Sequence, residues 1–189
     1  MPRLALIIAL FLLTPAVYFF YDYSRDAVID ELVAASQKND VTVFAARVDW
    51  EALRGFLKND LAAQKRSPLG SSFGPDLSQI DKVVDYYVQP ENIDIAFYYH
   101  EDVFTGIPER DFIVAEGFAP PFGFSMTLGF PKSVDAKEIP AAKDRLKARF
   151  VFRLDGLTWK IKEMHVPIFM VPRHVYSTPA VKVYGRTQK

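Results

Sequence analysis

An uncharged N-terminal segment constrains this chain more than any other feature. The eighteen residues that follow Arg3, from Leu4 to Tyr21, include no charged side chain. As an α-helix rising about 1.5 Å per residue, this run comes close to the roughly 30 Å hydrocarbon core of a bilayer. Tyr18, Tyr21 and Tyr23 lie where aromatic side chains line the membrane–water interface. We therefore expect residues 1–23 to form an uncleaved transmembrane signal-anchor.

Two other interpretations of this segment stay open. A cleaved signal peptide would have its apolar core over Leu4–Leu13, although no small-x-small cleavage motif follows that stretch. A buried helix of a soluble protein is the other. Arg3 precedes the run and four acidic residues follow it by position 31. The positive-inside bias then predicts a single-pass protein of the inner (cytoplasmic) membrane, with its C-terminal domain periplasmic and thus extracytoplasmic.

The rest of the chain has room for one domain and a short tail. We assign residues 24–168 to an α+β domain and residues 169–189 to a C-terminal tail. Residues 22–102 carry 15 acidic and 8 basic side chains, a net charge of −7, and their pattern is helical. Residues 103–189 carry 8 acidic and 14 basic ones, a net charge of +6, and their pattern is β. The chain has no Cys, which excludes disulfides, thiolate catalysis and Cys-based zinc sites.

Polar residues at helix-capping positions predict three helices after the apolar run. Ser24, Asp49 and Asp76 each precede apolar residues at helical spacing. Residues 91–100 fit either a helix or a strand, and we favour a helix because Pro90 suits a first helical turn. The side chains expected to be buried are Val28, Ile29, Leu32 and Val33 in the first helix, Trp50, Leu53, Phe56, Leu57 and Leu61 in the second, and Leu77, Ile80, Val83, Val84 and Tyr87 in the third.

From residue 111 the pattern predicts antiparallel strands. Residues 111–118 form one, and residues 122–130 alternate, with Phe122, Phe124, Met126, Leu128 and Phe130 on one face and small or polar residues on the other. Residues 148–162, ARFVFRLDGLTWKIK, predict a hairpin that turns at Asp155-Gly156. That turn would pair Leu154 with Leu157, Phe152 with Trp159 and Phe150 with Ile161, and bury Trp159 in the core.

The other face of this hairpin is basic and is our candidate binding surface. Its residues are Lys147, Arg149, Arg153, Lys160 and Lys162, with Arg149 expected opposite Lys162. Such a face would meet anionic lipid, a cell-wall polymer or another envelope protein; nucleic acid is not expected for an exported domain. The alternative is a solvated face that neighbouring acidic residues balance.

The sequence contains no motif for catalysis or for cofactor binding. A G-x-S-x-G elbow, a phosphate-binding Gly loop and an H-E-x-x-H helix are all missing. The three histidines, His100, His165 and His174, are scattered along the chain. We therefore predict no catalytic residue, metal or cofactor.

Four stretches carry a resemblance to a known family: KND (38–40), RVDWEALRGFLKNDL (47–61), YVQPENI (87–93) and DGLTWKIKEMHVP (155–167). Together they resemble a bacterial domain of unknown function, found in short exported proteins with one N-terminal membrane segment. In that family an acidic residue starts a helix with Leu-Arg and Leu-Lys pairs, matched here by Asp49, Leu53, Arg54, Leu57 and Lys58. The resemblance implies export and membrane attachment. The family has no established activity that could be carried over to this chain.

Helices followed by a curved antiparallel sheet are also similar to the cone-shaped domains of the nuclear-transport-factor and cystatin-like folds. Such cones serve many functions. Our principal hypothesis is a non-enzymatic, membrane-tethered interaction or adaptor domain. The alternatives are a cone that binds a small apolar ligand, and a hydrolase or isomerase with its site in the cone.

Overall fold

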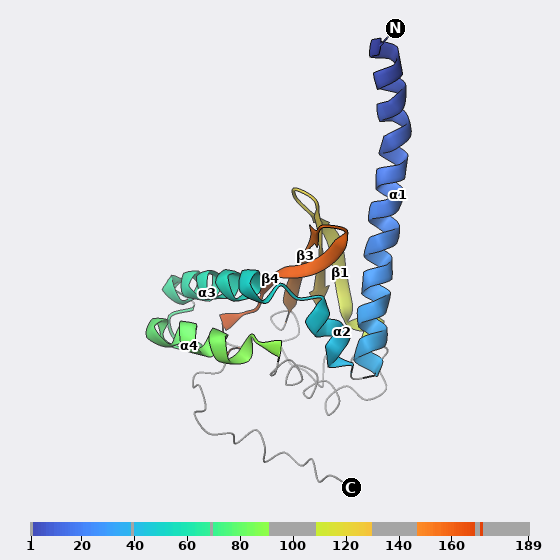
Figure 1. The fold of residues 1–189 in the computed structure, drawn as a ribbon. Helices are drawn as coiled ribbons and strands as arrows, with labels where there is room; N and C mark the ends of the chain where they lie inside the picture. Colours follow the sequence, from blue (N-terminus) through green and yellow to red (C-terminus); the bar gives the residue numbers. More distant parts are fainter. Residues whose placement is uncertain are drawn as a thin grey trace.

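Within the residues that it describes, the computed structural model shows four α-helices and a four-stranded antiparallel sheet, the α+β class that the sequence predicts (Figure 1). It describes residues 2–38, 40–68, 70–90, 109–129 and 147–168 and Val171, with side chains from Val17 onward. The sheet order is β1-β2-β3-β4. In chain order the elements are α1 (Pro2–Gln37), α2 (Val41–Ala46), α3 (Trp50–Arg66), α4 (Leu77–Tyr87), the 3₁₀-helix η2 (Glu109–Phe112), β1 (Ile113–Ala119), β2 (Gly123–Leu128), β3 (Ala148–Asp155) and β4 (Thr158–His165).

Helix α1 runs without a break through Ser24, where the sequence predicted the start of a separate helix. That prediction is wrong because the Ser24 hydroxyl has other partners: it donates to the Tyr21 carbonyl at 3.1 Å and accepts from Trp159 Nε1 at 2.9 Å. Figure 1 shows the C-terminal half of α1 beside the sheet and the N-terminal half extending past it. From Val17 onward, where the structure describes side chains, no helix combines the length and the apolar character needed to cross a membrane.

Helices α3 and α4 form where their capping residues predict. Asp49 accepts a hydrogen bond from the Ala52 amide at 3.1 Å, and α3 buries Leu53, Leu57 and Leu61. Helix α4 buries Ile80, Val83 and Val84. Leu77 was expected in this core and is 49% exposed instead. It is the first residue of α4, at the end of the α3–α4 pair that lies farthest from the sheet (Figure 1), so little of the domain covers it.

The sequence analysis missed the short helix α2. Asp40 caps it by accepting hydrogen bonds from the amides of Thr42 and Val43, at 3.1 and 3.4 Å. The helix sequence is VTVFAA, and its two valines and threonine favour strands when propensity alone is considered. Residues 91–100, the polar segment around 132–144 and nearly all of the predicted tail lie outside the described residues, so those expectations stay predictions.

The loop of the β3–β4 hairpin lies one residue further along the chain than predicted, so each β3 residue near the turn pairs two residues further along β4. Asp155 pairs with Thr158, so the two loop residues are Gly156 and Leu157. Gly156 has φ +61°, and it occupies the first loop position, where primed hairpin turns need positive φ. The predicted pairs Leu154–Leu157, Phe152–Trp159 and Phe150–Ile161 are therefore wrong.

The apolar face of the hairpin is nevertheless the predicted one. The observed pairs are Leu154 with Trp159, Phe152 with Ile161 and Phe150 with Met164. The register shifts between Val151 and Phe152, which leaves Lys162 as the extra residue of a bulge on β4. The bulge keeps the apolar side chains of both strands on one face on either side of the shift.

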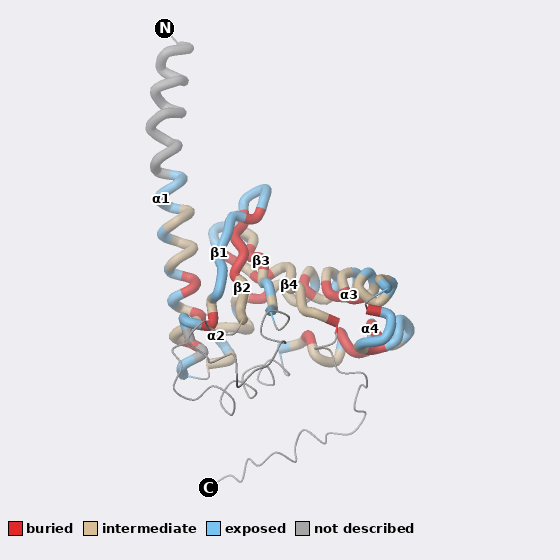
Figure 2. The backbone as a smooth tube through the Cα atoms, turned by 180° about the vertical axis from the view of Figure 1, so that it is seen from behind, coloured by how far each residue is buried: buried red, intermediate tan, exposed pale blue. Residues whose placement is uncertain are grey.

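The core centres on three aromatic residues of the sheet. Phe124 stacks on Phe152 with ring centroids 4.4 Å apart, and Trp159 meets Phe124 edge-on at 5.1 Å. All three are at most 1% exposed, which confirms the placement of Trp159 in the core. Figure 2 shows that buried positions run along the strands and recur on α1, α3 and α4. Phe122 was expected on the same strand face as the buried Phe124, and it is 75% exposed because β2 begins only at Gly123.

The segment before α3 extends the sheet beyond β4. Val48 forms a parallel bridge with Ile161. The Ile161 amide donates to the Arg47 carbonyl at 2.7 Å, and the Asp49 amide donates to the Ile161 carbonyl at 3.0 Å. These bonds cover part of the edge of β4 and place the start of α3 beside it.

Truncation of Trp159 tests this core. Trp159→Ala removes a buried ring and leaves a cavity, so the free energy of unfolding should fall by about 3–5 kcal/mol. Leu157→Ala, at an 82%-exposed position in the adjacent turn, should stay within about 0.5 kcal/mol of the wild type. Denaturant titration of the purified full chain, followed by circular dichroism, measures both changes. Equal midpoints for the two variants would show that Trp159 is not a core residue.

Candidate functional site

Arg153, one of the five predicted anion-binding residues, has protein partners on two sides. Its guanidinium lies 2.9 Å from a carboxylate oxygen of Glu163 on β4. Its Nη1 also donates to the Ala119 carbonyl at 2.9 Å and to the Pro120 carbonyl. Arg153 therefore ties the β1–β2 turn to the central strands, and its charge is balanced inside the hairpin.

A second residue of this basic surface is balanced by an acid from α3. Lys162 lies 3.2 Å from Asp49, and Arg149 is exposed opposite His165 and not, as predicted, opposite Lys162. The Ala52 amide is the main cause that holds the pKa of Asp49 below its usual value, with Lys162 and Lys160 adding to the effect. Asp49 thus remains ionised where it caps α3 and pairs with Lys162.

The five basic residues do not form one uniform positive surface. Lys160 lies opposite Arg153 across the hairpin, while Lys147 is exposed one residue before β3 begins. Acidic partners on Arg153 and Lys162 match the alternative that the sequence left open, a solvated face balanced by neighbouring acids. Anion binding by this surface stays a prediction.

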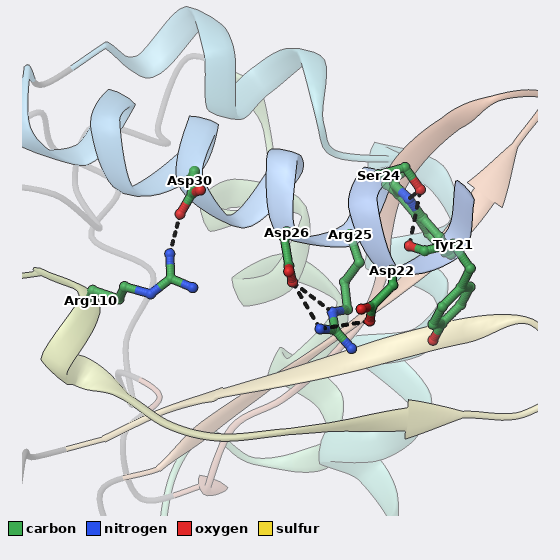
Figure 3. Close-up of polar contacts among 8 residues, drawn as sticks. Tyr21, Asp22, Ser24, Arg25, Asp26, Asp30 and Arg110 are labelled. Atoms are coloured by element: carbon green, nitrogen blue, oxygen red, sulfur yellow. Dashed lines mark hydrogen bonds and ion pairs between the residues drawn. The ribbon is translucent and has the colours of Figure 1, made fainter. Parts of the chain in front are cut away.

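A different site lies where α1 crosses the sheet (Figure 3). The Tyr21 hydroxyl donates to the Gly123 carbonyl at 2.8 Å, and its ring lies 5.5 Å from that of Trp159. One turn further on, Trp159 Nε1 donates to Ser24. These contacts join residues more than 100 positions apart in sequence and fix the position of α1 on the sheet.

We call the contacts of Tyr21 and Ser24 with the sheet the joint between α1 and the sheet. Ion pairs lie next to this joint, toward the C-terminal end of α1. Arg25 contacts Asp22 at 3.1 Å and Asp26 at 2.8 Å, and Asp30 pairs with Arg110 of η2 (Figure 3). Burial alone would lower the pKa of Arg25, but the hydrogen bond and charge of Asp26, with help from Asp22, raise it above its ordinary value. The first charged side chains after the apolar run are therefore already paired within the domain.

A hollow of about 250 Å³ lies between α1 and the β3–β4 turn. Its polar walls include Glu31 and Arg47, which form an ion pair with each other. Its apolar lining includes Phe20 and Leu157. The residues that line it are Phe20, Tyr23, Ser24, Ala27, Val28, Glu31, Arg47, Leu157 and Trp159.

Large apolar side chains are exposed at the turns of both hairpins. Phe118 is 61% exposed, Phe122 75% and Leu157 82%; we call these three residues the apolar rim. Both turns lie at the end of the sheet toward which the N-terminal half of α1 extends, and Figure 2 shows the β1–β2 turn in the colour of exposed residues. Sequence analysis missed this feature, although Phe122 follows two prolines and Leu157 follows the turn glycine.

The remaining titratable groups do not gather into a recognisable site. His165 Nδ1 lies 3.4 Å from Asp60, and its ring packs edge-on against Phe56 with centroids 4.7 Å apart. Over the described ranges, three His, Asp or Glu side chains never come together as a metal site would require. His100 and His174 lie outside those ranges.

Comparison with family models, with curated proteins and with solved structures gives no match for this chain. The resemblance to an exported bacterial family therefore stays a prediction from sequence.

Arg153 and Arg149 allow a matched test of how the basic surface is used. They share one face of β3, so the same substitution can be made at both. Arg153→Met keeps much of the apolar stem but removes its bonds to Glu163 and the turn, and should cost about 1–3 kcal/mol of stability. Arg149→Met should change stability by less than about 0.5 kcal/mol. Thermal unfolding measures both variants, and equal melting temperatures would contradict a structural role for Arg153.

Proposed function

We propose that this chain is an exported single-pass membrane protein whose α+β domain is a non-enzymatic interaction module. The observation that carries the proposal is the continuity of α1. The uncharged run Leu4–Tyr21 and the helical turns that pack on the sheet belong to one helix, Pro2–Gln37. An anchor of this kind would hold the domain directly at the membrane surface, without a flexible linker.

The exposed residues of α1 support membrane attachment. Val17, Tyr18, Phe19 and Phe20 are 47–71% exposed, and Tyr23 is 79% exposed. Burial of such side chains against lipid is favourable, and Tyr is enriched at the membrane–water boundary. With Arg3 on the short side and acidic residues after Tyr21, we propose the inner (cytoplasmic) membrane and an extracytoplasmic, periplasmic domain.

The interior of the domain supports an interaction module over a ligand-binding cone. Phe124, Phe152 and Trp159 fill the face of the sheet that the helices approach, and each is buried. A small-molecule site needs a concave space with convergent polar groups. In the hollow beside α1, the acid Glu31 is paired with Arg47. The partners we propose are therefore external: anionic lipid, cell-wall polymer or another envelope protein.

Topology tests this proposal directly. Alkaline phosphatase fused after Lys189 should be active, because the enzyme folds only outside the cytoplasm. The full-length protein should also stay in the membrane pellet after an alkaline wash that strips peripheral proteins. A soluble mature form beginning near residues 17–24 would contradict the anchor, whereas an inactive fusion would contradict export.

A further inference from the structure

We propose that the apolar rim, Phe118, Phe122 and Leu157, inserts into the interfacial layer of the same bilayer that α1 spans. The domain would then contact the membrane at three places: the helix and the turns of both hairpins. This inference rests on the proposed anchoring and adds a lipid-binding surface to it. The ligand is the headgroup and upper acyl-chain region of the outer leaflet.

The contacts of Tyr21 place the rim at the correct height. Tyr21 is the last residue of the uncharged run. Its hydroxyl donates to the carbonyl of Gly123, the residue after Phe122, and its ring centroid lies 6.3 Å from that of Phe118. When Leu4–Tyr21 spans the hydrocarbon core, the β1–β2 turn must lie at the boundary where that core ends.

The β3–β4 turn also lies close to the end of the uncharged run. Leu157 and Phe20 both line the hollow beside α1, and Phe20 is one residue before the end of the run. Figure 1 and Figure 2, seen from opposite sides, both show the two turns directed along the N-terminal half of α1. Both turns therefore lie at the end of the sheet toward which the uncharged run extends, and the β1–β2 turn reaches further along α1 (Figure 1).

The β1–β2 turn is also suited to an environment with little water. Pro120 and Pro121 have no amide hydrogen, so they carry no donor that would need a partner. The carbonyls of Ala119 and Pro120 accept from Arg153, and that of Gly123 accepts from Tyr21. An unpaired backbone group is costly in lipid, and here side chains of the domain satisfy these three acceptors. The exposed side chains of this turn, Pro120, Pro121 and Phe122, are all apolar, and Phe122 is 75% exposed.

On α1 the charged side chains begin directly after the uncharged run, whereas the β3–β4 turn carries one exposed acid, Asp155. Asp22, Arg25 and Asp26 follow the uncharged run and pair with one another, which leaves the helix uncharged up to the level of the rim. The side chains of α1 thus change from apolar to charged within one helical turn. The polarity of a bilayer changes in the same way across its headgroup layer. A protein partner would not need to coincide with the end of the anchor, and for this reason we favour lipid.

The absence of Cys from the chain makes a direct test possible. Single cysteines replace Phe122, Leu157, Leu10 or Ser78, and each carries an environment-sensitive fluorophore. The full chain is reconstituted into vesicles of phosphatidylcholine and phosphatidylglycerol, with or without lipids that carry a quenching spin label near the headgroup end of the acyl chain. Leu10 reports the anchor, and Ser78 is an exposed control on α4.

Labels at Phe122 and Leu157 should shift their emission to shorter wavelength and lose intensity in the spin-labelled vesicles, while the label at Ser78 does neither. A quenched Leu10 label together with unquenched, water-like rim labels would overturn the inference and leave the anchor intact. Rim labels that shift without being quenched would indicate a second copy of the chain over the rim, and would also overturn it. Failure of the Leu10 label to be quenched would contradict the proposed anchoring itself.

Discussion

The hydrogen bonds that Tyr21 and Ser24 make to the sheet determine how the rest of the structure is arranged. Tyr21 bonds to Gly123 and Ser24 to Trp159, and the rings of Tyr21, Trp159 and Phe124 pack in a chain. Because Trp159 and Phe124 are also the centre of the sheet core, α1 cannot move without disturbing that core. The helix that we propose as the anchor is thus part of the domain.

The basic surface and the apolar rim of the hairpins have different roles. On the basic surface, Arg153 and Lys162 are paired with Glu163 and Asp49, so much of its charge serves the fold. These ion pairs are partly buried, so salt should weaken them less than it weakens pairs on an open surface. In the apolar rim, by contrast, Phe122 and Leu157 are exposed and point away from the domain. We therefore place the interaction with the membrane on the rim.

Local signals in the sequence were sufficient to predict most of the elements. Asp49 caps α3 as expected, and the alternation of β2 and of the last hairpin gave strands with Trp159 inside. These predictions depend on residues close in sequence. A long-range contact explains the error at Ser24: in sequence it resembles a helix cap, but in the structure Trp159 Nε1, 135 residues later, donates a hydrogen bond to its hydroxyl.

Errors in the hairpins came from turn geometry. The loop lies one residue further along the chain, with Gly156 at positive φ in its first position, and the pairs near the turn shift by two residues and keep the apolar face. The bulge at Lys162 then places Met164 opposite Phe150. Neither shift can be read from alternation, because each keeps the inside–outside pattern of most positions. The rim was missed for a related reason: Phe122 and Leu157 fit the apolar pattern, and only the turn limits show that they lie outside the core.

The central claim is that α1 and the sheet domain form one rigid body. Spin labels at Phe19→Cys on α1 and Glu51→Cys on α3, both exposed positions, test it through pulsed electron paramagnetic resonance on the reconstituted full chain. The account predicts a single narrow distance distribution, in detergent and in vesicles alike. A broad distribution, or two populations, would show a hinge between the proposed span and the domain and would contradict the account.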